Sequence, residues 1–141
     1  MSDTSGAYCG RGQHGDVWLV AGSFGETVRR KCSVPAGTRI AGPALNLWAT
    51  PADECNAWLA EGVVAVRLDA EDVPVTTIAA EPVTFSGVAD NVVSGRAGKV
   101  RTTVCGLWFS AGPLSPGEHT LSIVGKNGTF RLNVAYTLTV R

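Results

Sequence analysis

The chain has 141 residues, the length of one domain, which we assign to residues 1–141. Its 45% hydrophobic and 17% charged residues are typical of a folded chain rather than a disordered one. Twelve basic residues balance twelve acidic ones, which excludes a sequence-independent grip on nucleic acid, and no apolar run reaches the length of a membrane span.

The residue types favour strands. The chain contains 18 valines and 13 threonines, and 17 glycines and seven prolines interrupt it at short intervals. We therefore predict an all-β fold, an antiparallel β-sandwich of jelly-roll or Ig-like character with one short α-helix. The predicted strands before the C-terminal hairpin are 17–21, 27–32, 39–48, 63–68, 73–78, 83–88 and 101–109.

The predicted helix follows residue 48. Thr50 suits the N-cap and Pro51 the first helical position. Within the helix, Cys55, Trp58 and Leu59 share one face by the spacing of a helical turn. We expect this amphipathic helix to cover one end of the sandwich.

The C-terminus gives the clearest strand pattern. Apolar and polar residues alternate from Phe130 to Val140, which indicates a strand with one buried face. Leu121 and Ile123 mark the preceding strand, and the Asn-Gly pair at 127–128 predicts a tight turn between the two strands.

The four cysteines, Cys9, Cys32, Cys55 and Cys105, form no closely spaced pair, so we predict neither a zinc site nor any other metal or cofactor. Two disulfides are the favoured interpretation, and four buried thiols in a reducing compartment are the alternative. Three connectivities are possible. We favour Cys9–Cys32 with Cys55–Cys105, because the first pair brackets a predicted hairpin.

The first ten residues contain no charged region followed by an apolar one, so they do not predict a secretory signal. A signal replaced by a start methionine would explain this, and so would a virion component that is released by lysis. We expect the protein to lie outside the cell or on a virion surface.

Catalytic motifs are weak. His14 and Asp16 lie in a glycine-flanked polar stretch that is typical of a loop, although an aspartate near a histidine could orient it as a base. Glu118 and His119 are adjacent, so on a strand they point to opposite faces. We expect His119 to be hydrogen-bonded near the turn before it.

Tryptophans offer binding surfaces. Trp18 and Trp108 lie in apolar runs and are predicted core residues, whereas Trp48 and Trp58 flank or lie in the helix and could stack on a ligand such as a sugar. The aperiodic segment 89–99, with Arg96 and Lys99, is predicted to be the least ordered loop and a possible binding loop.

The basic run at residues 29–31 is interpreted as a solvated or edge-protecting face of a strand.

Three segments carry a resemblance to known sequences. They are CGRGQHGDVWLVAG at 9–22, RKCSVPAG at 30–37 and PLSPGEHTL at 113–121, followed by the alternating strand through Tyr136. This pattern resembles a group of uncharacterised secreted bacterial proteins. The resemblance implies a secreted β-sandwich with Cys9 bridged to Cys32, and it implies no activity.

These observations favour a non-catalytic extracellular or particle-surface module that binds a protein partner, assembles with itself or decorates a structure such as a virion capsid or tail. One alternative is a small enzyme with a cleft near His14 and His119, with the 89–99 loop as a lid. Another is a carbohydrate-binding module, which would present Trp48 or Trp58 in a flat exposed row.

Overall fold

The computed structural model describes residues 3–48 and 51–141, which form two β-sheets and one helix. In chain order the elements are β1 (Val17–Leu19), β2 (Thr27–Val34), β3 (Arg39–Trp48), α1 (Ala52–Ala60), β4 (Val63–Leu68), β5 (Glu71–Asp72), β6 (Val75–Gly87), β7 (Gly98–Ala111), β8 (Gly117–Asn127) and β9 (Phe130–Val140). The predicted all-β sandwich with one short helix is confirmed.

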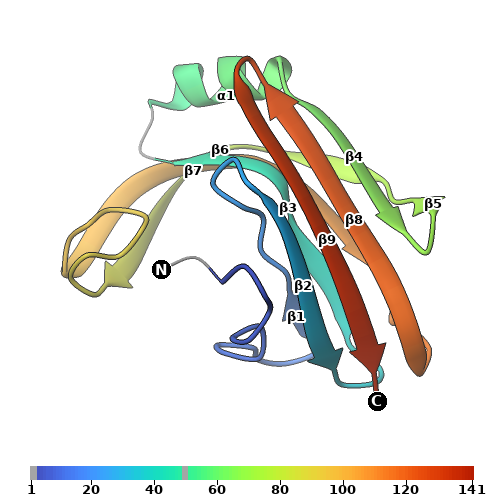
Figure 1. Cartoon of the computed structure of the whole chain (residues 1–141). Helices are drawn as coiled ribbons and strands as arrows, with labels where there is room; N and C mark the ends of the chain where they lie inside the picture. The colour runs from blue at the N-terminus through green and yellow to red at the C-terminus, as the bar shows by residue number, and fades with distance from the viewer. Residues whose placement is uncertain (1–2, 49–50) are drawn as a thin grey trace.

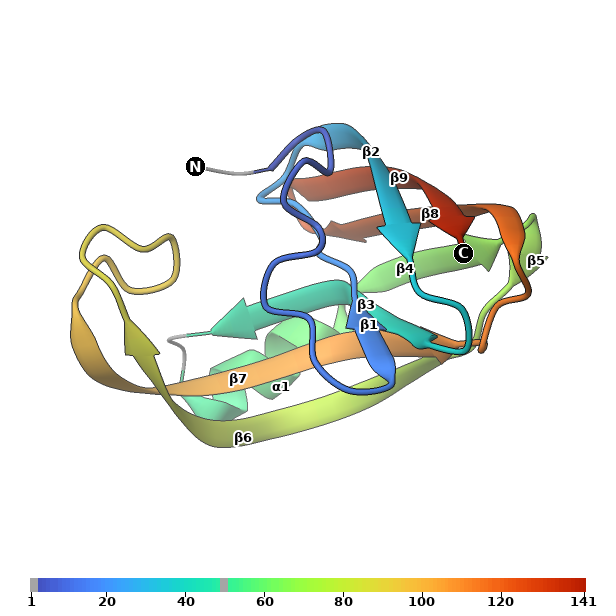
Figure 2. The ribbon, with the colours of Figure 1, turned by 90° about the horizontal axis from the view of Figure 1, so that it is seen from below.

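The two sheets face each other across the core. One has the strand order β1-β3-β7-β6 and the other β2-β9-β8-β4-β5, and Figure 2 shows them as separate layers. Most pairs are antiparallel as predicted, but β1 with β3 and β2 with β9 are parallel. Parallel pairing arises because the chain crosses between the sheets after β1 and again after β2, instead of turning back within one sheet.

The strand β9 lies between β2 and β8 in the second sheet, and its burial pattern is the one that its sequence predicts. Leu132, Val134, Tyr136, Leu138 and Val140 are buried, and the intervening side chains are exposed or half-buried. Their inward faces pack against residues of the other sheet such as Ile40 and Phe109, which are nearly inaccessible. Alternation with a period of two therefore sets which face of this strand enters the core.

The predicted strands 73–78 and 83–88 form one continuous strand, β6, whose register against β7 shifts between Ile78 and Glu81. Pro82 lies just after this irregularity and cannot donate a ladder hydrogen bond. It is tolerated because β6 is the edge strand of its sheet.

Helix α1 begins at Ala52 with Pro51 at the N-cap, one residue later than predicted, and the expected cap Thr50 lies outside the described residues. Cys55 and Leu59 are its buried residues. The helix packs on the end of β3 and on the middle of β6 and β7 (Figure 1).

Both predicted disulfides are present, Cys9–Cys32 and Cys55–Cys105. The second ties α1 to β7 through a buried bridge, since Cys55 is 0% and Cys105 2% exposed. The first does not bracket a hairpin, because β1 and β2 belong to different sheets. It ties the N-terminal segment to β2 instead.

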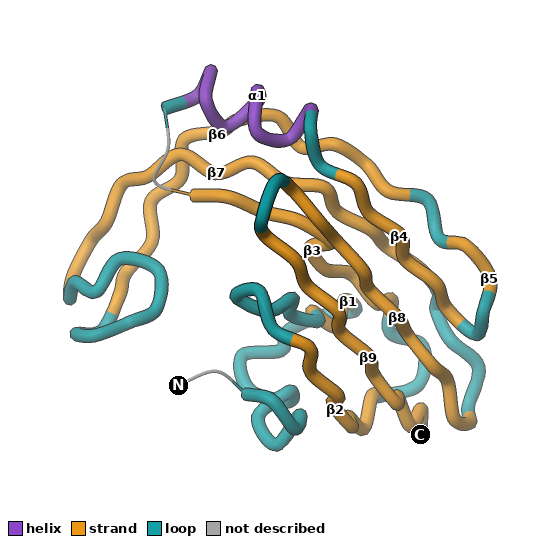
Figure 3. Tube along the Cα trace, turned by 45° about the horizontal axis from the view of Figure 1, so that its top comes forward, coloured by secondary structure: helices purple, strands orange, loops and turns teal. Residues whose placement is uncertain are grey.

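The hairpin of β6 and β7 extends beyond the sandwich as an arm, with residues 88–97 at its tip (Figure 3). One side chain, that of Asn91, closes the tip by hydrogen bonds. The amide of Asn91 donates to the carbonyl oxygens of Val88 and Arg96 at 2.7 and 2.8 Å, and its oxygen accepts from the backbone of Val93 and Ser94.

No helix within residues 3–48 and 51–141 is long and apolar enough to cross a membrane.

Candidate functional site: an aromatic groove at a sheet edge

A groove of about 470 Å³ lies where the end of β3, the crossover between β1 and β2, helix α1 and the start of β9 come together. Its lining residues are Ala21, Gly22, Ser23, Phe24, Pro43, Asn46, Leu47, Trp48, Trp58, Phe130 and Leu132. None of these described residues is charged, and four of them are aromatic. The groove therefore suits an uncharged, largely apolar ligand.

The aromatic side chains form two edge-on pairs. The rings of Phe24 and Trp48 have centroids 6.2 Å apart at an interplanar angle of 83°. The rings of Trp58 and Phe130 are 6.5 Å apart at 65°. Both predicted binding tryptophans are half-buried in the same groove. Edge-to-face packing does not give these pairs the flat, coplanar surface that a row of stacked sugars would need.

Trp58 is held in place from both sides of the sandwich. The side-chain amide of Asn127, at the end of β8, donates to the carbonyl oxygen of Trp58. The neighbouring Cys55–Cys105 bridge fixes the helix to β7. Asn127 is itself buried, so the turn that the sequence predicts between β8 and β9 also anchors the helix.

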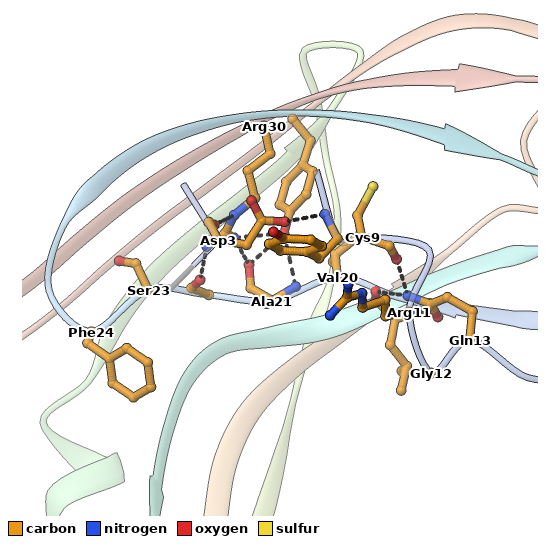
Figure 4. A pocket seen from close by; sticks show the side chains of 14 residues that line it. Asp3, Cys9, Arg11, Gly12, Gln13, Val20, Ala21, Ser23, Phe24 and Arg30 are labelled. Carbon is orange, nitrogen blue, oxygen red and sulfur yellow. Dashed lines mark hydrogen bonds between the residues drawn. The ribbon is translucent and has the colours of Figure 1, made fainter. Parts of the chain in front are cut away.

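Arg30 fixes the crossover that carries Phe24. Its guanidinium donates to the carbonyl oxygens of Ala21 and Gly22 at 2.6 and 2.9 Å and to the hydroxyl of Tyr136 at 2.7 Å, and its Nε donates to the carbonyl of Asp3 at 2.6 Å. The Tyr136 hydroxyl also bonds both backbone groups of Ala21. Figure 4 shows this cluster, with Phe24 pointing away from Arg30.

A second cavity, of about 340 Å³, adjoins this cluster and shares the crossover residues with the groove. Arg11 stacks over the ring of Tyr8 there, with 4.2 Å between the guanidinium carbon and the ring centroid. The carboxylate of Asp3 accepts hydrogen bonds from the backbone of Ser5, Gly6 and Tyr8, and these bonds lower its pKa, the bond from Tyr8 most of all. The charged groups of this cavity are thus engaged in fixing the N-terminal segment.

The burial of Arg30 corrects the interpretation of residues 29–31 as a solvated or edge-protecting face at that one residue, whereas Arg29 and Lys31 are exposed on the edge strand β2 as expected. Arg30 is 6% exposed and forms no ion pair with any carboxylate in the described ranges. Carbonyl and hydroxyl oxygens satisfy its donors instead. The two-residue period of the strand could have predicted that Arg30 is buried, because Arg30 shares the inward face with Val28, Cys32 and Val34.

His119 forms a polar cluster at the opposite end of β8. Its Nδ1 lies 2.6 Å from Oδ2 of Asp69, and its Nε2 lies 2.8 Å from the carbonyl oxygen of Ser115. The predicted hydrogen bond near the preceding turn is thus confirmed. The bond to Asp69 chiefly, and the bond to Ser115 next, raise the pKa of His119. The same bond from His119 holds the pKa of Asp69 below its usual value.

Two acceptors face the two ring nitrogens of His119, so the doubly protonated imidazolium fits this position best. The backbone N–H of Thr120 donates to the other carboxylate oxygen of Asp69 at 2.8 Å. The pair therefore connects the turn between β4 and β5 with the start of β8, and it leaves neither ring nitrogen available to a substrate.

The remaining catalytic candidates do not join His119 at a cavity. His14 forms an isolated bridge with Val17, and the backbone carbonyl of Asp16 accepts from Arg39. Glu118 is exposed on β8 opposite Thr139. None of these residues, nor His119, lines the groove or the cavity beside Arg30.

Arg96 and Lys99 are exposed on the arm, Arg96 in the tip and Lys99 on β7. They line neither the groove nor the cavity beside Arg30. Trp18 is buried as predicted, whereas Trp108 is half-buried. In the part of the chain that the structure describes, no cluster of His, Cys, Asp and Glu could hold a metal ion.

No family model matches the chain, and no curated protein matches it. Among solved structures, the crystal structure of a cysteine protease inhibitor, EhICP2, from Entamoeba histolytica is similar with a TM-score of 0.38 and 11% sequence identity. The match covers 89% of this chain and 96% of that chain. A likeness of this extent carries no conclusion about function.

Proposed function

We propose that the protein is a non-catalytic, disulfide-bridged β-sandwich module that binds a partner through the aromatic groove. The supporting observation is that Phe24, Trp48, Trp58 and Phe130, which come from four separate segments, line one uncharged groove. Aromatic side chains dominate the binding energy of many interfaces, because they bury large areas at a small cost in conformational entropy.

Two disulfides are typical of proteins in oxidising compartments. We infer that the module works outside the cell or on the surface of a particle such as a virion, where a rigid sandwich resists reduction and unfolding. Its partner is then a protein that presents an uncharged surface to the groove.

The test compares the wild-type protein with Phe24→Ala and Tyr8→Ala on a displayed library of random peptides and on a glycan array. Phe24 is 53% exposed and Tyr8 is 55% exposed, so the two variants remove similarly exposed rings. Phe24 lines both cavities and Tyr8 only the cavity beside Arg30. A ligand of the groove loses at least about tenfold in affinity with Phe24→Ala and is unaffected by Tyr8→Ala.

Equal binding by wild-type protein and Phe24→Ala would overturn the proposal, as would failure of the wild-type protein to bind either collection. Turnover of ester, peptide or glycoside substrates that is abolished by His119→Ala or His14→Ala would replace the module by an enzyme. Binding to glycans alone would keep the module and change the class of its ligand.

A further inference from the structure

Within residues 3–48 and 51–141, no strand pairs with the edge of β3 that lines the groove. The short strand β1 pairs with β3 only from Arg39 to Ala41, and the last bond on this side runs from the N–H of Val20 to the carbonyl of Ala41. Beyond it the described chain crosses to the other sheet. From Pro43 to Trp48, β3 therefore pairs with β7 on one side only.

The direction of the backbone groups decides which of them face the open side. The carbonyl oxygen of Leu45 lies toward Gly106 of β7. Because successive residues of a strand direct their N–H and C=O to alternate edges, Asn46 and Trp48 direct theirs away from β7. Within the described residues, nothing outside the ladder with β7 bonds to the backbone of Asn46 or Trp48. Both residues line the groove.

Three other edge strands, β2, β6 and β5, carry features that limit pairing. The N-terminal segment covers part of β2, with Lys31 donating to the carbonyl of Ser5. On β6 the side chain of Asn56 accepts from the backbone of Ala80, and Pro82 has no N–H. The edge strand β5 has two residues, both acidic. Proteins block edges in these ways because an open edge pairs with other chains.

We propose that the occupant of the groove is an extended, uncharged peptide segment of a protein partner, which adds as a strand to the edge of β3 at Asn46 and Trp48. This inference rests on the proposed function and specifies its ligand. Free main-chain donors and acceptors in register match a second peptide backbone, and the aromatic rings beside them accept alternate side chains. Charge agrees with this choice, because the groove offers no charged side chain to a charged partner.

The first measurement uses the free protein. Amide hydrogen exchange by NMR should find Asn46 and Trp48 exchanging at least about tenfold faster than Leu45 and Leu47, whose amides bond to β7. A peptide selected from the displayed library, and lost on Phe24→Ala, should then slow exchange at Asn46 and Trp48 and leave Leu45 and Leu47 unchanged. Slow exchange at Asn46 and Trp48 in the free protein would overturn the inference.

The second measurement is a scan of the selected peptide with one N-methyl group at each position in turn. Strand addition predicts an alternating result, with affinity reduced about tenfold or more at every second residue of the paired segment and unchanged between. This scan needs no substitution in the protein, so misfolding cannot produce the pattern.

Three results would overturn strand addition. A peptide that binds without alternation would place the ligand in the groove by its side chains and leave the proposed function intact. Ligands found only among glycans would also overturn strand addition, and the module would keep its binding function with a carbohydrate ligand. A dimer that forms through this edge, detected by light scattering and dissociated by Phe24→Ala, would make a second copy of the chain the occupant.

Discussion

The strands β2 and β3, one from each sheet, differ in how much of their free edges is covered. The edge of β2 is covered by the N-terminal segment, which a disulfide ties down at Cys32. The edge of β3 is covered only over its first residues by β1, and the rest opens into an aromatic groove. An open edge exposes backbone groups that can pair with another chain, and this contrast supports the proposed strand addition at β3.

The two edges also differ in their roles, because the contacts around β2 stabilise the fold and the open edge of β3 forms the candidate binding surface. Around β2, Arg30 and Tyr136 satisfy backbone groups of the crossover with buried hydrogen bonds. Around the end of β3, the backbone of Asn46 and Trp48 bonds to no second strand among the described residues, and the side chains beside it pack edge-on. The covered side stabilises the crossover, and the crossover in turn positions Phe24 at the open side.

The largest effect is expected from removing the bridge between α1 and β7. Cys55→Ala with Cys105→Ala opens a link between residues 50 positions apart and should lower the free energy of unfolding by about 4 kcal/mol. Urea denaturation followed by circular dichroism measures the loss. A decrease below about 1 kcal/mol would show that packing alone holds the helix in place.

Releasing the cover of β2 should cost somewhat less. Cys9→Ala with Cys32→Ala opens a link across 23 positions, and loop-closure entropy predicts a loss of about 3 kcal/mol. The N–H of Lys31 should lose protection against hydrogen exchange, because its acceptor is the tethered Ser5. Unchanged protection at Lys31 would show that the N-terminal segment stays on the edge of β2 without the disulfide. The amides at the edge of β3 serve as the internal reference, because their exchange should be the same in both proteins.

Tyr136→Phe removes the hydroxyl that joins Arg30 to the crossover. The variant leaves a buried guanidinium N–H and the N–H of Ala21 without their acceptor, and we expect a loss of about 2 kcal/mol in unfolding free energy. Tyr8→Phe is the control, because Tyr8 is exposed and its loss of a hydroxyl should be neutral. Equal values for the two variants would contradict a structural role for the hydroxyl of Tyr136.

The pair of His119 and Asp69 should make stability depend on pH. The raised pKa of His119 gives stability that is complete below its usual value of 6.5 and is lost as pH rises through the folded-state pKa. The lowered pKa of Asp69 gives stability present above its usual value of 3.8 and lost as pH falls through the folded-state pKa. The contribution of the pair is therefore greatest between these two usual values.

The size of this contribution is limited to about 1 kcal/mol, because the side chain of Asp69 is 47% exposed and solvent screens the pair. Unfolding in urea between pH 4 and pH 9 measures it. His119→Gln should flatten the decline of stability above pH 6.5. A wild-type decline that persists unchanged in this variant would assign the pH dependence to other groups.

The smallest effect on stability is expected from Phe24→Ala. Its ring is half exposed, so the unfolding free energy should change by less than about 0.5 kcal/mol. The variant therefore separates recognition from folding at the open edge. A loss of several kcal/mol would instead show that the ring of Phe24 supports the crossover, and loss of binding by this variant could then not be read as loss of a ligand contact.

Much of the architecture was predictable because it follows local patterns. Alternation from Phe130 to Val140 predicts both the bounds and the buried face of β9, and the helical spacing that turns Cys55 inward agrees with its bridge to Cys105. Cys9 and Cys32 pair as predicted, but they do not bracket a hairpin, because β1 and β2 lie in different sheets. Which strands become neighbours depends on contacts between distant segments, and no local period encodes them.

The groove was predictable only in part. Trp48 and Trp58 drew attention as aromatic residues near the helix, but Phe24 and Phe130 did not, because nothing local shows that the crossover after β1 and the start of β9 meet there. The charge of Arg30 predicts a solvated side chain, whereas its place in the alternation of β2 predicts a buried one, and the structure follows the alternation.

The sequence by itself determined the fold class, most strand positions, the inward face of β9 and the expectation of two disulfides, because these follow from side-chain periodicity, turn residues and cysteine number. Which cysteines pair was decided by the tertiary structure, since four cysteines allow three connectivities. The tertiary structure decided that β1 stops short of covering β3, that Arg30 is buried against the crossover, and that four aromatic rings meet beside an open edge. Those features depend on where strands end relative to partners far away in the chain, and that relation exists only once the two sheets have packed.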